Sequence, residues 1–239
     1  MTVLDNKKLS HFDQLKKLIR ESDELLIVSP FLSTDIYALL EGLSAAKHIK
    51  SITLVTVLAA FDQAITQPRI LCNFIAFCVR NNIAYRLYID EALHSKIYLF
   101  KKVNKPCYAV VTSANFTSKG LKENHETGVT ITDSDTLYNL ERNSVESCLE
   151  LSSDDIAIVN AAAKLHIKQN GNKTFTPPRF NPWSLLATDT DSDGPPLYPD
   201  RNLYIKPIGC TQEPYIAHEP LSSRIHFSKK SQVYALVTY

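Results

Sequence analysis

Short apolar runs alternate with amphipathic segments between residues 25 and 88, and this alternation constrains the fold more than any other feature. The apolar runs at 25–28, 52–57 and 83–88 have the length of buried β-strands. Residues 68–81 carry apolar side chains at helical spacing, and Ser33 or Thr34 is suited to cap a helix that ends near residue 44. Strand, helix, strand, helix, strand in this order predicts a parallel sheet with helices packed on it.

The segments on either side of this core extend the pattern. Residues 5–20 predict an amphipathic first helix, and residues 134–149 and 154–165 predict two closing helices, for which Ser134 and Ser153 are candidate caps. The apolar runs 97–100 and 108–111 predict a hairpin, and 127–132 predicts a further strand. We therefore expect an α/β fold with a mixed, mainly parallel sheet flanked by helices.

The chain changes character after residue 166. Residues 167–200 are rich in Pro and Asp and predict a linker, whereas 201–239 alternate as β-strands do, at 203–209, 224–228 and 233–239. The spacing of Asp189, Asp191 and Asp193 is similar to the start of a calcium loop, but the twelfth position lacks Glu and no helices flank it, so we expect no calcium site. The β-rich segment is interpreted either as an appendage that completes the fold or dimer, or as the start of a larger module.

Composition excludes several classes of protein. With 44% hydrophobic and 21% charged residues the chain is typical of globular proteins, and no apolar run is long enough to span a membrane. The five cysteines have scattered spacings, which predicts a reduced, cytoplasmic protein without a zinc site. Because the net charge is only +1, any contact with nucleic acid must come from a local basic patch.

Polar residues gather at the predicted hairpin. His94 and Lys96 share one strand face because strand side chains repeat every two residues, and Ser113 and Asn115 share a face on the neighbouring strand. Glu126 stands just before the next predicted strand. A nitrogen nucleophile, a fixed cation and hydrogen-bond donors would suit the attack on a phosphodiester. Ser29 and Ser33, at the carboxyl end of an earlier strand, favour turn and capping roles over a site role.

The ordered set His-x-Lys, Ser-x-Asn-Phe-Thr and Gly-Leu-x-x-Asn-x-Glu resembles the catalytic motif of the phospholipase D superfamily. The resemblance covers about residues 20–165 and is strongest to the nuclease branch with one motif per chain, which includes restriction endonucleases. It implies a phospholipase D-like fold. One departure is Lys101, which stands where many members, lipid enzymes among them, carry Asp.

The resemblance also implies site roles. His94, Lys96 and Glu126 would be catalytic, with a phosphohistidine intermediate, and Ser113, Asn115 and Thr117 would bind the substrate. No metal or other cofactor is implied. Because the family's chemistry uses two motifs and this chain has one, a homodimer acting on DNA is expected. Residues 201–239 could then be a fragment of a DNA-binding module.

Two other functions stay open at this level. The first is a phosphodiesterase that acts on lipids or other small diesters; Lys101 and the single motif count against it. The second is a catalytically degenerate module of a defence system that binds nucleic acid or forms dimers; the intact motif counts against that. In the plainest interpretation, His94 and Lys96 are only the exposed face of a strand.

Overall fold

The computed structural model describes residues 2–59, 64, 66–170 and 182, and the backbone of strands at 203–207, 215–217 and 234–237. The N-terminal part holds β1 (Val3–Asp5), α1 (His11–Arg20), β2 (Glu24–Val28), α2 (Ile36–Gly42), α3 (Ala45–His48), β3 (Ser51–Thr56), α4 (Gln67–Arg80) and β4 (Ala84–Ile89). There follow β5 (Ile97–Lys102), β6 (Lys105–Thr112), α5 (Ser118–Lys122), β7 (Thr127–Ile131), α6 (Ser134–Val145), β8 (Leu149–Glu150) and α7 (Ser153–Asn170).

These strands form one sheet in the order β1-β7-β6-β5-β2-β3-β4-β8. The strands β2, β3 and β4 run parallel, which confirms the prediction from the strand–helix alternation. The sheet is mixed, as predicted, but it is not mainly parallel: five of the seven strand pairs are antiparallel. The β5–β6–β7 meander joins β2 antiparallel, and the short strands β1 and β8 extend both sides.

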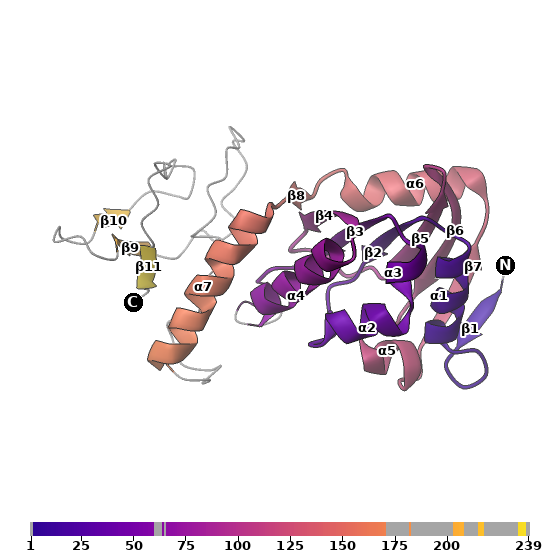
Figure 1. Cartoon of the computed structure of the whole chain (residues 1–239), viewed down its shortest axis with the longest axis horizontal. Coiled ribbons are helices and arrows are strands. Elements are labelled where there is room, and N and C mark those ends of the chain that lie inside the picture. The colour runs from indigo at the N-terminus through magenta and orange to yellow at the C-terminus, as the bar shows by residue number, and fades with distance from the viewer. Residues whose placement is uncertain are drawn as a thin grey trace.

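Helices cover the two faces of the sheet unequally (Figure 1). Along β2, Leu25 and Ile27 pack with the cluster that α1–α5 and α7 contribute to, whereas Leu26 and Val28 pack with the cluster under α6. This follows from the twofold repeat of strand side chains. The larger cluster includes fully buried Phe74, Phe77 and Tyr98, which anchor the helices on that face. None of the helices in the described ranges has the length and apolarity to cross a membrane.

The helix caps differ from the predicted ones by one or two residues. Asp35 caps α2 by accepting a hydrogen bond from the Ala38 amide at 3.0 Å, in place of Ser33 or Thr34. Asp133, and not Ser134, caps α6. Ahead of α7, the hydroxyl of Ser152 accepts from the Asp155 amide at 3.2 Å. In each case a neighbouring side chain of similar capping ability takes the position.

The C-terminal region is described only in part. The strands β9 (Leu203–Pro207), β10 (Tyr215–Ala217) and β11 (Tyr234–Val237) form an antiparallel sheet in the order β10-β9-β11. Two of them fall on predicted strands and β10 does not, while the strand expected at 224–228 lies outside the described residues. So do nearly all of the 167–200 linker and its Asp-rich segment, and α7 extends past the expected domain boundary at 166.

The topology brings several chain segments to one end of the sheet. Because β5 is antiparallel to β2 and to β6, β5 begins where β2 and β6 end, and β7 begins there as well. We call this the motif end of the sheet. The residues that precede β5, follow β6 and precede β7 are those that the sequence assigns to the site.

Candidate active site

His94 and Lys96 lie at the motif end, directly before β5. The side chain of His94 is exposed and that of Lys96 is half-buried. The Lys96 ammonium donates to the His94 carbonyl at 2.8 Å, and the Lys96 carbonyl accepts from the Thr112 amide at 3.1 Å. The second bond holds the start of β5 beside the end of β6, so the two halves of the predicted motif are neighbours.

Ser113 and Glu126 are in direct contact. The Ser113 hydroxyl donates to Glu126 Oε2 at 2.5 Å and accepts from the Thr127 amide at 3.1 Å. The other carboxylate oxygen of Glu126 accepts from Asn124 Nδ2 at 3.2 Å. Both oxygens of this half-buried carboxylate are therefore engaged, which fixes its orientation.

Asn115 has a buried amide oxygen that accepts no hydrogen bond within the described part of the chain. Such an atom is uncommon in native structures, because an unmade hydrogen bond costs about 1–3 kcal/mol. The backbone around it is well held: the Asn115 carbonyl accepts from the Thr117 amide at 2.7 Å. The backbone of Asn115 is therefore fixed, and its amide oxygen is open to a partner.

Thr117 has a structural role. Its hydroxyl accepts from the Gly120 amide at 2.9 Å and caps α5. Gly120 is required for this packing, since a Cβ there would lie 2.6 Å from the Asn115 carbonyl oxygen. The expected contact between Thr117 and substrate stays a prediction.

The Ser29–Ser33 turn is hydrogen-bonded to residues 113–117, the turn after β6 that we call the motif turn. The buried hydroxyl of Ser29 accepts from the Phe116 amide at 2.9 Å and donates to the Phe31 carbonyl at 2.8 Å. The Ser33 amide donates to the Phe116 carbonyl at 2.9 Å. Both serines therefore hold the turn next to Asn115, as the sequence favoured.

Tyr98 is a supporting residue that the sequence did not reveal. Its hydroxyl donates to the Ala114 carbonyl at 2.7 Å from a fully buried position on β5. Burial raises the pKa of Tyr98 well above its usual value, so the hydroxyl keeps its proton and remains a donor. An apolar strand pattern does not distinguish a tyrosine that supports the site from one that only fills the core.

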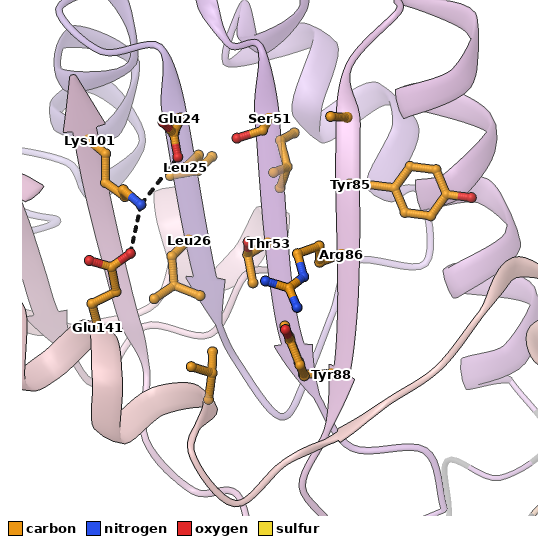
Figure 2. Close-up of a pocket in the computed structure, with 13 residues that line it drawn as sticks. Glu24, Leu25, Leu26, Ser51, Thr53, Tyr85, Arg86, Tyr88, Lys101 and Glu141 are labelled. Carbon is orange, nitrogen blue, oxygen red and sulfur yellow. Dashed lines mark hydrogen bonds and ion pairs between the residues drawn. The ribbon is translucent and has the colours of Figure 1, made fainter. Parts of the chain in front are cut away.

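Lys101 lies at the other end of β5, about 16 Å from Lys96 at the usual rise of a strand. It forms ion pairs with Glu141 of α6 at 2.7 Å and with Glu24 of β2 at 3.2 Å (Figure 2). Burial lowers the pKa of Lys101, but the bonds to Glu141 and Glu24 outweigh burial and raise it. Lys101, which departs from the superfamily pattern, thus belongs to a structural ion-pair network away from the motif end.

A cavity of about 250 Å³ opens over β2, β3 and β4 near this network (Figure 2). Its charged side chains are already paired, Lys101 as above and Arg86 through a bidentate bond to Glu150. None of the predicted site residues lines it. Within the described ranges no three His, Cys, Asp or Glu side chains are grouped closely enough to hold a metal ion.

Comparison with known proteins bears on the identity of this site. The family model described as the NgoFVII restriction endonuclease N-terminal PLD domain matches residues 7–156. A search of curated proteins gives no match.

Three solved structures are similar at low identity. NucT from Helicobacter pylori has a TM-score of 0.43 and 15% identity, over 63% of this chain and 98% of that one. The phospholipase D family member Nuc from Salmonella typhimurium has a TM-score of 0.44 and 15% identity, over 64% and 97%. Polyphosphate kinase from Porphyromonas gingivalis has a TM-score of 0.40 and 16% identity, over 60% and 25%.

The family match extends over more than half of the chain and includes all six predicted site residues. One end of a mixed sheet flanked by helices carries the predicted site residues His94, Lys96, Ser113, Asn115 and Glu126. The chain therefore belongs to the NgoFVII restriction endonuclease family, with the phospholipase D-type domain, and is a phosphodiesterase of the nuclease class.

Proposed function

We propose that the protein is a metal-independent DNA endonuclease that forms a phosphohistidine at His94, in a site completed by a second copy of the chain. The observation that carries this proposal is the Glu126 carboxylate held by Ser113 and Asn124 at the same end of the sheet as His94 and Lys96. A carboxylate with both oxygens held can orient an imidazole and stabilise its cationic form. A bond between Glu126 and an imidazole stays a prediction.

The reaction would have two steps. In the first, a ring nitrogen of His94 attacks phosphorus, the P–O bond to the leaving group breaks, and His94 of the second copy protonates the departing oxygen. In the second, that histidine takes a proton from water, the water oxygen attacks phosphorus, and the P–N bond breaks. The Lys96 ammonium would stabilise the negative charge on the nonbridging oxygens.

Ser113 and Asn115 would then have different roles. Ser113 has one hydroxyl proton and donates it to Glu126, so while this bond is kept Ser113 orients the carboxylate. Lys96 and the amide group of Asn115 remain as the candidate ligands of the phosphate. This assignment is narrower than the one expected from sequence, in which Ser113 binds the substrate as well.

The dimer follows from the count of motifs. His-x-Lys occurs at His94, His48 and His166, but only His94 and Lys96 lie at the motif end, followed by Ser113, Asn115 and Glu126. His48 ends α3 and His166 lies on α7, so the chain has one complete motif. The two steps need a nucleophile and an acid on opposite sides of phosphorus, and a twofold axis through the cleft supplies both from identical chains. Two Lys96 side chains would approach there, and an anionic phosphate would offset their repulsion.

Local positive charge favours a DNA substrate despite the net charge of +1. The short helix α5, which starts just after the motif turn, carries Lys119 and Lys122. The Lys122 ammonium lies 4.0 Å from the centre of the Phe12 ring and Lys16 lies 5.9 Å from it, so lysines of α1 and α5 converge. None of these three lysines takes part in the ion pairs found among the described residues. Such lysines suit a phosphate backbone.

The first test compares two exposed histidines. His94→Ala should abolish turnover with little loss of stability, because a side chain at the solvent surface contributes little to the core. His125→Ala is the matched control and should keep wild-type rates. Lys96→Ala should lower the rate roughly 10²-fold by removing a contact to the transition state. Steady-state cleavage rates together with thermal unfolding decide the outcome, and wild-type rates in His94→Ala would remove the site assignment.

The second test concerns metal. Because catalysis by imidazole needs no bound cation, cleavage of plasmid DNA should proceed unchanged in EDTA. The His94→Ala variant is the control for contaminating nucleases. Cleavage that appears only after addition of a divalent metal and vanishes in EDTA would mean that the proposed mechanism is wrong.

The third test concerns the shared site. Wild-type and His94→Ala chains are mixed in varied ratios and refolded together, and the cleavage rate is measured at constant total protein. If two copies of His94 are needed in one dimer, an equal mixture should keep about one quarter of the wild-type rate, because random pairing makes that share of wild-type dimers. A rate that falls in direct proportion to the wild-type fraction would show that each chain works alone.

A further inference from the structure

A fully buried histidine lies directly behind the motif end, outside the predicted motif. His11 is the first residue of α1 and its side chain has 0% exposure. Its Nδ1 lies 2.7 Å from Asn6 Oδ1, and its Nε2 lies 2.7 Å from Thr112 Oγ1. A buried imidazole with both nitrogens in short contacts can fix the segments that it joins.

Asn6 determines which nitrogen of His11 carries the proton. The Asn6 amide group donates to the carbonyls of Gly120 and Asn124, each at 2.9 Å. Its oxygen accepts from the His11 amide at 2.9 Å, and must therefore accept from Nδ1 as well. Nδ1 is thus protonated, and in the neutral ring Nε2 is an acceptor for the Thr112 hydroxyl.

The neutral ring fits this environment. Burial lowers the pKa of His11, while the charges of Glu126 and Asp5 oppose that shift. The Thr112 hydroxyl then donates a hydrogen bond to His11 Nε2, and its oxygen accepts one from the Ala114 amide at 3.0 Å.

Thr112 is well placed to fix the residues around it. Its hydroxyl oxygen accepts from the Ala114 amide, and the neighbouring Thr127 carbonyl accepts from the Ser113 amide at 3.0 Å. Thr112 and Ala114 flank Ser113 at the end of β6, and Thr127 follows Glu126 at the start of β7. His11 therefore supports the two segments that meet in the Ser113–Glu126 bond.

Asn6 supports the second donor to the carboxylate. It binds the backbone carbonyl of Asn124, whose side chain donates to Glu126. Both side chains that hold Glu126 are consequently tied to one pair, the half-buried Asn6 and the buried His11. Gly128 allows the approach, because a Cβ there would lie 2.9 Å from His11 Nε2 and 2.8 Å from Thr112 Cβ.

We propose that the hydrogen-bonded chain Asn6–His11–Thr112, built around the buried imidazole of His11, is a positioning device that holds Ser113 and Glu126 in their working geometry. None of the three residues needs to touch the substrate, so they are positioning residues and not catalytic ones. The proposal rests on the proposed function in one respect, which is that Glu126 acts in phosphodiester cleavage.

The test uses Thr112→Val, which removes the hydroxyl and keeps the side-chain shape, and Thr112→Ser, which restores the hydroxyl. Ser22→Ala is the control: it removes a buried hydroxyl that donates to the Leu18 carbonyl at 2.8 Å, near the start of β2 and away from the motif end. Rates are measured with bis(p-nitrophenyl) phosphate at a temperature where every variant is folded.

Thr112→Val should lower kcat roughly 10²-fold, as misplaced catalytic groups do, and leave KM within about twofold. Thr112→Ser should return kcat to near the wild-type value, and Ser22→Ala should not change it. A merely structural hydroxyl would lower the unfolding temperature in Thr112→Val and Ser22→Ala alike without this selective loss of kcat. Wild-type kcat in Thr112→Val, or no rescue by Thr112→Ser, would overturn the proposal.

A second readout does not depend on activity. Amide hydrogen exchange at Ala114 and Thr127 should accelerate in Thr112→Val and stay at the wild-type rate in Ser22→Ala. If the wild-type enzyme cleaves no phosphodiester, the proposed function fails, and hydrogen exchange still tests the positioning device. Unchanged exchange at both amides in Thr112→Val would overturn it even in an active enzyme.

Discussion

The antiparallel pairing of β5 with β2 and β6 is the constraint on which the site depends. It places Val28 opposite Ile97 and Ile97 opposite Val111, so the residues before β5 meet the residues after β6. A register shift by one residue would move the side chains of β5 from one hydrophobic cluster to the other, and the packing of both clusters opposes that. The energy of core packing therefore fixes the position of His94 and Lys96 relative to Ser113.

Around this framework the polar groups are arranged in two shells. Ser113 and Asn124 orient Glu126 at the surface, while Asn6, His11 and Thr112 hold the segments that carry these residues from behind. Because the imidazole of His11 is fully buried, water competes less for its hydrogen bonds to Asn6 and Thr112. The surface is left with the groups that can reach a phosphodiester.

Local pattern predicted much of this structure. Apolar runs marked β2, β3 and β4, and spacing along the chain placed His94, Lys96, Ser113, Asn115 and Glu126 at one end of the sheet. The prediction of a mainly parallel sheet was wrong, because the β5–β6–β7 meander joins β2 through an antiparallel pair. The three-residue β1 and the two-residue β8, which are too short to leave a periodic signal, add two more antiparallel pairs.

The supporting contacts of Asn6, His11 and Thr112 could not be predicted from the sequence. His11 meets Thr112 across about one hundred positions of the chain, and Asn6 meets Gly120 and Asn124 across even more. Such contacts are set by the tertiary fold and carry no local pattern. The structural role of Lys101 could not be predicted for a related reason: its acidic partners Glu24 and Glu141 come from two distant segments of the chain.

The two-step attack by His94 is the central claim, and the stereochemistry at phosphorus tests it most directly. The enzyme would cleave a diester with one phosphorothioate of known configuration in water enriched in heavy oxygen, and the configuration of the product would be determined. Two successive in-line displacements each invert phosphorus, so the account predicts net retention. Net inversion would show that water attacks directly and would contradict a phosphohistidine intermediate.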